Sequence, residues 1–256
     1  MSSFQSSARQ GLLRPLRRIG LAAAARWPFP VKCRIHSGRA MFVDLRSAVS
    51  RGIFMRAEFD PAFFLPLKKI LRPGDVFLDV GANVGYYSML ALDLVGSEGV
   101  VHAFEIDPRP LRCLRKSIAT ERIPNLRVHE VAVGNQIGRA KLVRESDCGN
   151  SHLTSGHSAV GMDVGMTTLD SWHAEQCKPR IRAIKLDIEG GELAALQGAS
   201  QLLLDEAPAI VCEAWDNVEP AFSKAALFLR ELGYTIESIP DVHSPAFFGY
   251  SARANM

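Results

Sequence analysis

The sequence contains few cysteines, no apolar run long enough to cross a bilayer, and little net charge. Its five cysteines are scattered over 256 residues and form no C-x-x-C pair. This pattern indicates neither a disulfide framework nor a cysteine-bound zinc ion, and it fits a reducing, cytoplasmic location. The formal net charge of +3 is too small to indicate a nucleic-acid-binding surface by itself.

Several catalytic and nucleotide-binding motifs are also missing. The chain has no P-loop and no G-x-S-x-G nucleophile elbow. The dinucleotide fingerprint G-x-G-x-x-G is incomplete: with Gly81 as its first glycine, Asn83 and Tyr86 occupy the other two glycine positions. Their side chains obstruct the close approach of a pyrophosphate and of the following helix. An NAD-dependent oxidoreductase is therefore disfavoured, although it remains an alternative.

Acidic residues are absent from the first part of the chain. The first acid is Asp44, whereas eight lysines and arginines precede it. Apolar residues between Leu12 and Leu21 lie near helical spacing, so we expect residues 1–32 to form a basic, helical N-terminal segment. A transit peptide and a membrane-surface helix are the alternatives.

The rest of the chain predicts an α/β protein in two parts. Residues 33–74 are expected to contain short strands, including one at 52–54, and a helix that begins after Asp60, all packed on the core domain. Residues 75–256 alternate strands and helices, which predicts a mostly parallel central sheet with helices on both faces. Its parallel strands are expected at 76–80, 100–105, 126–133, 182–187 and 209–213. Residues 145–163 are polar and are expected to form a long loop.

The stretch from Val76 to Ser88 organises this core domain. A buried strand, a turn with two glycines and a helix in succession present a helix N-terminus to a nucleotide-like ligand. Asp79 beside the turn would repel phosphate but suits a cation, such as the ammonium or sulfonium of S-adenosylmethionine. Glu105 follows Gly85 by 20 residues, a spacing at which an acid commonly binds ribose hydroxyls. The alternative is that Asp79 only caps the helix.

Further acids follow two later strands. Asp187 and Glu213 end their strands at the edge of the sheet where ligands bind, and Glu189 follows in the loop. A pair such as Asp187 and Glu189 could accept a proton from a hydroxyl or hold a divalent metal, although no metal is specifically indicated. Lys185 is a possible structural partner for one of these acids. Asn150 and His152, with Glu213, are candidate substrate contacts.

These motifs, taken together, resemble the FkbM family of S-adenosylmethionine-dependent methyltransferases. The resemblance covers residues 42–213, and its motifs lie at 42–46, 58–61, 76–86, 103–105, 167–170 and 184–192. It implies a Rossmann-like methyltransferase fold and O-methylation of hydroxyl groups, with Asp187 and Glu189 beside the transferred methyl. The implied cofactor-binding residues are Asp79, Gly81, Ala82, Asn83, Gly85, Tyr86 and Glu105. His152 and Gly191 depart from the residues common in the family.

The sequence therefore predicts an O-methyltransferase that uses S-adenosylmethionine and acts on a hydroxyl of a glycan or small metabolite. The N/D-P-P-Y motif of enzymes that methylate nitrogen in bases and glutamine is absent. No nucleic-acid partner and no transmembrane segment are expected. A non-catalytic binding module with a methyltransferase-like fold is the second alternative.

Overall fold

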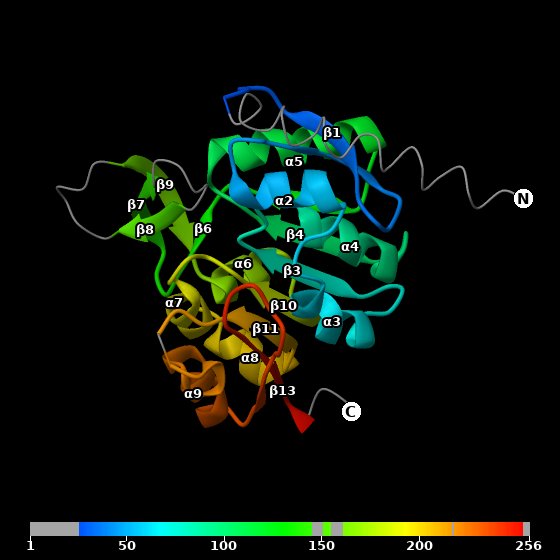
Figure 1. The fold of residues 1–256 in the computed structure, drawn as a ribbon. Coiled ribbons are helices and arrows are strands. Elements are labelled where there is room, and N and C mark those ends of the chain that lie inside the picture. The colour runs from blue at the N-terminus through cyan, green and yellow to red at the C-terminus, as the bar shows by residue number, and fades with distance from the viewer. Residues whose placement is uncertain (1–25, 145–150, 155–160, 217, 253–256) are drawn as a thin grey trace, which may run out of the picture.

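The computed structural model describes residues 26–144, 151–154, 161–216 and 218–252. Its centre is a seven-stranded sheet (Figure 1). Five neighbouring strands are parallel, and a C-terminal hairpin adds two antiparallel strands at one edge. In spatial order the strands are β12 (Thr235–Ser238), β13 (Ala246–Tyr250), β11 (Ala209–Glu213), β10 (Ile181–Leu186), β3 (Val76–Val80), β4 (Val100–Phe104) and β5 (Leu126–His129). The predicted, mostly parallel sheet is confirmed.

Helices cover both faces of this sheet because successive residues of each buried strand point in opposite directions. Phe77 packs into one apolar core, whereas Leu78 packs into the other. The first core is covered by α3 (Pro61–Ile70), α4 (Tyr86–Val95) and α5 (Pro108–Glu121). The second is covered by α6 (Leu169–Glu175), α7 (Glu192–Gln197), α8 (Ser200–Glu206) and α9 (Lys224–Glu231).

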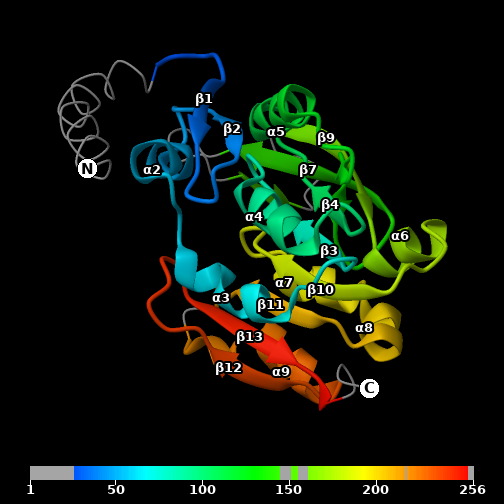
Figure 2. The same cartoon turned by 90° about the vertical axis from the view of Figure 1, so that its right-hand side faces the viewer.

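The N-terminal extension consists of β1 (Val31–Arg34), β2 (Ala40–Val43) and α2 (Ala48–Arg56). Figure 2 shows β1 and β2 beside α5, well away from the C-terminal hairpin. The contact includes a buried hydrogen bond from the Phe42 amide to Ser117 Oγ of α5, at 2.8 Å. The strand predicted at 52–54 is wrong, because these residues lie inside α2. Ser47 caps that helix by accepting from the Ser50 amide, a local signal that outweighs a three-residue apolar pattern.

The predicted strand 126–133 is divided between two sheets. β5 ends at His129, and β6 (Ala132–Val133) pairs instead in a four-stranded sheet with the order β6-β9-β7-β8. This second sheet also contains β7 (Gly138–Arg144), β8 (Ser151–Thr154) and β9 (Met162–Thr167). The expected loop at 145–163 is therefore interrupted by β8, which pairs with β7, and by the start of β9. Residues 145–150 and 155–160 of that loop lie outside the described residues.

Helices α7 and α8 follow each other closely and are separated at Gly198. A Cβ at Gly198 would lie 2.0 Å from the carbonyl oxygen of Gly134. Glycine at this position therefore allows the backbone between α7 and α8 to pack directly against the backbone at Gly134. Between β11 and β12 the chain forms a 3-10 turn, η1 (Pro220–Phe222), and then α9, which Ser223 caps. In the described part of the chain no helix combines the length and apolarity needed to span a membrane.

Substituting Ser117 should test how the N-terminal strands are held. In Ser117→Ala the Phe42 amide loses its only side-chain acceptor while remaining buried, so the free energy of unfolding should fall by about 1–3 kcal/mol. Urea denaturation followed by circular dichroism measures this change. The matched variant Ser200→Ala loses a near-surface bond to the Gln197 carbonyl and should change stability by no more than about 0.5 kcal/mol. Equal losses of stability in both variants would show that the hydrogen bond between Phe42 and Ser117 does not hold the N-terminal strands on α5.

Candidate active site

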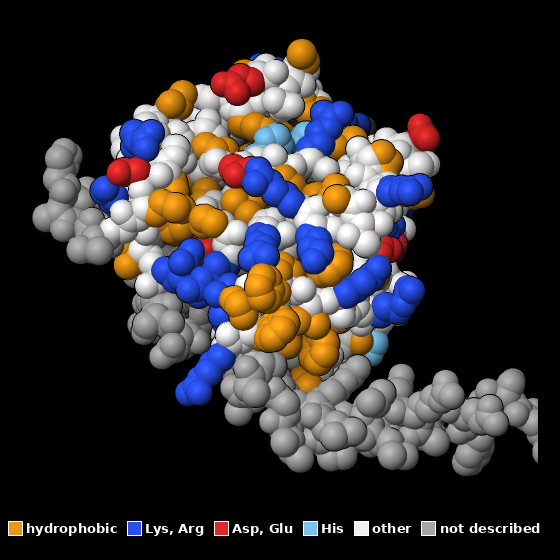
Figure 3. All heavy atoms as spheres, turned by 90° about the horizontal axis from the view of Figure 1, so that it is seen from above, with side chains coloured by type: hydrophobic (Ala, Val, Ile, Leu, Met, Phe, Trp, Pro, Cys, Tyr) orange, Lys and Arg blue, Asp and Glu red, His pale blue; other side chains and the backbone are white. Residues whose placement is uncertain are grey.

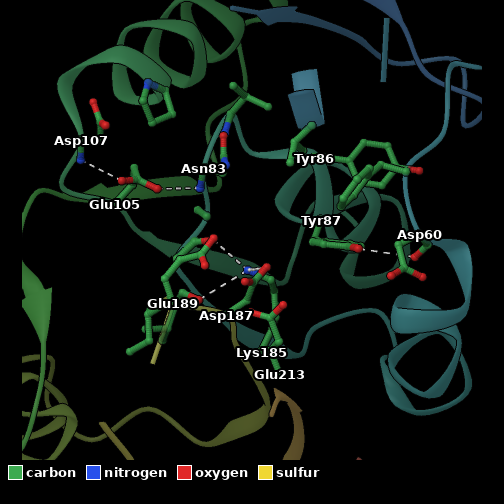
Figure 4. A pocket seen from close by; sticks show the side chains of 18 of the residues that line it. Asp60, Asn83, Tyr86, Tyr87, Glu105, Asp107, Lys185, Asp187, Glu189 and Glu213 are labelled. Atoms are coloured by element: carbon green, nitrogen blue, oxygen red, sulfur yellow. Dashed lines mark hydrogen bonds and ion pairs between the residues drawn. The ribbon is translucent and has the colours of Figure 1, made fainter. Parts of the chain in front are cut away.

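A cavity of about 980 Å³ opens at the C-terminal ends of the parallel strands. It lies at the point where the strand order reverses, between β3 and β10, which is where doubly wound sheets bind their ligands. Its walls come from the turn after β3, the ends of β4, β10 and β11, helix α2 and the loop before β13. Figure 4 shows Lys185, Asp187 and Glu213 gathered together, with Asn83 and Glu105 to one side and Asp60 and Tyr87 to the other.

Two glycines shape the turn after β3. Gly81 has a φ of +78°, and a Cβ there would lie 1.8 Å from the carbonyl oxygen of Asp187. Gly85 has a φ of +85°, precedes α4, and would place a Cβ 2.4 Å from Leu114. The positive φ favours glycine at both positions, and at Gly81 the backbone of Asp187 also leaves no space for a Cβ. Gly81 lines the cavity together with Ala82, whereas Gly85 supports the turn from beneath.

The carboxylate of Glu105 holds this turn against the end of β4. Its Oε2 accepts a hydrogen bond from the Asn83 amide at 2.7 Å, and its Oε1 accepts from the amides of Ile106 and Asp107 at 2.7 and 2.8 Å. Burial raises the pKa of Glu105, and these three bonds oppose the rise. A carboxylate offers about four acceptor positions, so about one remains for a ligand. Both Asn83 and Glu105 line the cavity.

A buried ion pair lies beneath the cavity. Asp79 and Lys185 are partners in the register of β3 and β10, and Lys185 Nζ lies 3.0 Å from Asp79 Oδ1. Their side chains are 0% and 1% exposed. Ser88 Oγ of α4 donates to Asp79 Oδ2 at 2.6 Å, and Lys185 Nζ also donates to the Gly81 carbonyl at 2.8 Å. The structure thus places Lys185 where the sequence placed a cofactor cation, and Asp79 does not line the cavity.

Asp187 is the most exposed member of this charge cluster, although Lys185 and Glu213 also line the cavity. Its Oδ2 lies 3.5 Å from Lys185 Nζ, and its side chain is 32% exposed. Its neighbour Glu213 is buried and accepts a hydrogen bond from Trp215 Nε1 at 2.7 Å. Burial, together with the charge of Asp187 and a hydrogen bond to it, raises the pKa of Glu213 to about 9. Glu213 is therefore protonated at neutral pH and donates to Asp187.

The loop after β10 carries Glu189 into the cavity wall. Glu189 adopts a φ of +57° and Gly190 a φ of +99°, so the chain turns sharply here. Glu192 in the first turn of α7 is buried, and its Oε1 accepts from the amides of Ile188 at 2.9 Å and Gly190 at 3.3 Å. Glu192 therefore stabilises the loop rather than facing a ligand.

One wall of the cavity contains, besides the predicted Tyr86, residues that the sequence did not indicate as site residues. Asp60 caps α3 as expected, but it also accepts from the Tyr87 hydroxyl at its carbonyl and from the His243 amide at Oδ2, at 3.4 and 2.6 Å. The ring of Phe59 lies edge-on to Tyr86 at 6.5 Å and to His243 at 5.9 Å. All five residues line the cavity. No sequence signal links His243 to residues some 180 positions earlier.

Two predicted substrate contacts are not placed. Asn150 lies outside the described residues, and for His152 only the backbone is described, as part of β8 opposite Val143. The residues that the structure describes contain no group of three or more histidine, cysteine, aspartate or glutamate side chains that could hold a metal ion.

Comparison with known proteins gives the family. The model of the methyltransferase FkbM domain matches residues 79–236 of the chain. The chain belongs to the FkbM methyltransferase family. Like its family, it is an S-adenosylmethionine-dependent methyltransferase. This assignment replaces the NAD-dependent oxidoreductase and the non-catalytic module that the sequence left open.

Individual FkbM relatives are distant in sequence. The 31-O-demethyl-FK506 methyltransferase FkbM of Streptomyces tacrolimicus is 28% identical over 210 residues, which are 70% of this chain and 78% of the relative. The crystal structure of methyltransferase FkbM from Methylobacillus flagellatus matches with a TM-score of 0.51 and 18% identity. That match covers 78% of this chain and 52% of the solved chain, so this chain spans about half of its length. It supports the Rossmann-like fold.

Removing the buried cation should destabilise this methyltransferase strongly. In Lys185→Met the carboxylate of Asp79 remains buried without its counter-ion, which should lower the free energy of unfolding by about 3–5 kcal/mol. Urea denaturation provides the measurement. In the control Lys141→Met the lost ion pair with Asp163 is at the surface, and the change should stay below about 1 kcal/mol. A Lys185→Met protein as stable as this control would show that the buried pair is not needed for folding.

The proton on Glu213 should make stability depend on pH. Because folding raises this pKa from its ordinary 4.5 to about 9, the contribution of Glu213 is complete below pH 4.5 and is lost as the pH rises through about 9. In Glu213→Gln the amide stays neutral and can still donate to Asp187. Between pH 6 and pH 9 the wild-type free energy of unfolding should therefore fall relative to that of Glu213→Gln, by up to about 1.4 kcal/mol per pH unit. Parallel pH profiles of the two proteins would refute a protonated Glu213.

Proposed function

We propose that this enzyme methylates a hydroxyl oxygen of a glycan or small metabolite, with Asp187 receiving or orienting the hydroxyl proton. The observation that carries the proposal is the position of Asp187: it is the accessible carboxylate of a cluster that is otherwise buried, at the cavity edge beside Gly81. The relative from Streptomyces is named for methylation of an oxygen of a small molecule, which supports the same type of acceptor.

The residues around the turn after β3 fit the cofactor. Gly81, Ala82, Asn83, Tyr86 and Glu105 line one continuous part of the cavity. The remaining acceptor position of Glu105 suits a ribose hydroxyl, and glycine at position 81 leaves room for a ligand close to the backbone. Asp79 and Gly85 would act from beneath, by fixing Lys185 and the turn. When bound, S-adenosylmethionine supplies an electrophilic methyl group on a sulfonium.

The neighbours of Asp187 define what it can do. Lys185 Nζ lies 3.5 Å from Asp187 Oδ2, and the protonated carboxyl of Glu213 donates a hydrogen bond to Asp187, so part of this carboxylate is already occupied. A carboxylate in this setting is a weak base, so it would hold the hydroxyl in line and take its proton only as the oxygen becomes bonded to the methyl carbon. Glu189 on the adjacent loop is the second candidate for this role. Neither role requires a metal ion, although Asp187 and Glu189 are residue types that could bind a divalent cation.

A pair of variants separates chemistry from cofactor binding. We expect Asp187→Asn to bind S-adenosylmethionine normally and to lose turnover by roughly 10²–10⁴-fold, because an amide cannot accept the proton. Glu105→Ala should instead lose cofactor affinity, since it removes a carboxylate that also holds the Asn83 amide. Calorimetry measures binding, and transfer of a labelled methyl group to fractionated glycans and metabolites measures turnover.

The same assay contains its controls. Glu175→Gln changes an exposed acid at the end of α6, outside the cavity lining, and should leave both properties unchanged. If Asp187→Asn and Glu189→Gln both transfer methyl at the wild-type rate, neither acid is catalytic. Loss of turnover on adding a chelator, restored by magnesium, would show a metal mechanism. If total RNA added to the assay is labelled and the glycan and metabolite fractions are not, the proposed acceptor class is wrong.

A further inference from the structure

The face formed by α5 and the segment before β1 combines exposed aromatic rings with cations. We call it the basic aromatic face and define it by Trp27, Phe29, Lys32, Arg109, Arg112, Arg115 and Lys116. Seen from above, lysine and arginine side chains lie around a group of apolar side chains on this side of the molecule (Figure 3). It lies on α5, β1 and the residues just before β1, and none of its defining residues lines the cavity described above.

The two aromatic rings are held in place but largely uncovered. Trp27 is 53% exposed and Phe29 is 52% exposed, and their rings meet edge to face at 5.5 Å. The guanidinium of Arg112 lies 5.6 Å from the centre of the Phe29 ring and donates to the carbonyl of Pro28 at 3.5 Å. An exposed tryptophan and phenylalanine fixed side by side are costly in water, and such patches commonly mark an interaction surface.

Helix α5 continues the face with positive charge. Arg112 follows Arg109 by three residues, and Arg115 and Lys116 follow Arg112 by three and four, so the four cations share one side of the helix. The opposite side of α5 is buried through Leu111, Cys113 and Leu114. Two acids lie nearby: Glu121 pairs with Lys32 at 3.0 Å, and Glu130 pairs with Arg115. The face therefore keeps a net positive charge.

The sequence that leads into this face has the same character. Residues 1–26 contain five arginines and no acid, and they include Leu12, Leu13, Leu16, Ile19 and Leu21. Basic residues combined with leucine, phenylalanine and tryptophan are the composition that binds at the interface of an anionic bilayer. A nucleic acid would also attract the arginines, but it offers nothing to these aliphatic side chains. We propose that the basic aromatic face docks on a membrane surface that contains anionic lipid.

Binding of the full-length protein to vesicles tests the proposal. The protein should sediment with vesicles of phosphatidylcholine and phosphatidylglycerol but not with phosphatidylcholine alone, and added salt should weaken this binding. Trp27→Ala with Phe29→Ala should reduce the partition coefficient at least about tenfold, because the rings no longer enter the interface. Arg112→Gln with Lys116→Gln should reduce it by a similar factor, through lost attraction to the lipid charge.

Matched variants on other faces serve as controls. Phe222→Ala removes a ring that is 62% exposed, and Lys68→Gln with Lys69→Gln removes two charges from α3. Both should bind vesicles as the wild type does, and circular dichroism should show that every variant is folded. Failure of the wild type to bind anionic vesicles overturns the proposal, as does an equal loss in the control variants. Tighter binding of a single-stranded RNA homopolymer, unaffected by the loss of Trp27 and Phe29, would reassign the face to nucleic acid.

Discussion

The buried ion pair between Asp79 and Lys185 is the constraint on which the site depends. Each charge costs several kcal/mol to remove from water, and the pair is tolerable only while the two groups stay in contact and hydrogen-bonded. That contact requires β3 and β10 to keep one register, since the two residues face each other across these strands. The same ammonium group bonds the carbonyl of Gly81. Lys185 therefore couples the register of β3 and β10 to the position of the turn after β3, because it contacts both Asp79 and Gly81.

The charge of Lys185 also explains how several acids share one cavity. Asp79 neutralises it from below and Asp187 approaches it from the cavity side, so its ion pairs are with these two acids and not with Glu213. Burial of Glu213 and the neighbouring charge of Asp187 both disfavour its ionised form, so its pKa is raised and it retains its proton at neutral pH. The result is one accessible carboxylate whose orientation is held by a cation and by a neutral acid. Such an arrangement positions a hydroxyl well, and it avoids a concentration of negative charge that folding would have to overcome.

Charge is separated over the molecule at a larger scale. The acids gather at the C-terminal ends of the central strands, whereas lysines and arginines gather on α5 and the N-terminal extension. A net charge of +3 conceals this division, because it averages an acidic cavity with a basic face. None of the residues that define the basic aromatic face lines the cavity, so the two are built from different side chains. The acids follow the strand ends, whereas the cations belong to α5 and to the segment around β1.

The sequence by itself determined the features that depend on near neighbours in the chain. The strand, glycine turn and helix around Gly81, the acid Glu105 after the next strand, and the family motifs all follow from local patterns and short spacings. Tertiary structure alone decided which charges meet. Asp79 is buried with Lys185 instead of facing a ligand, Glu213 keeps a proton, and His243 lies against Asp60, because register, burial and long-range packing set these contacts. The division of 126–133 between two sheets has the same cause: a strand's residues show that it can pair, but not with which partner.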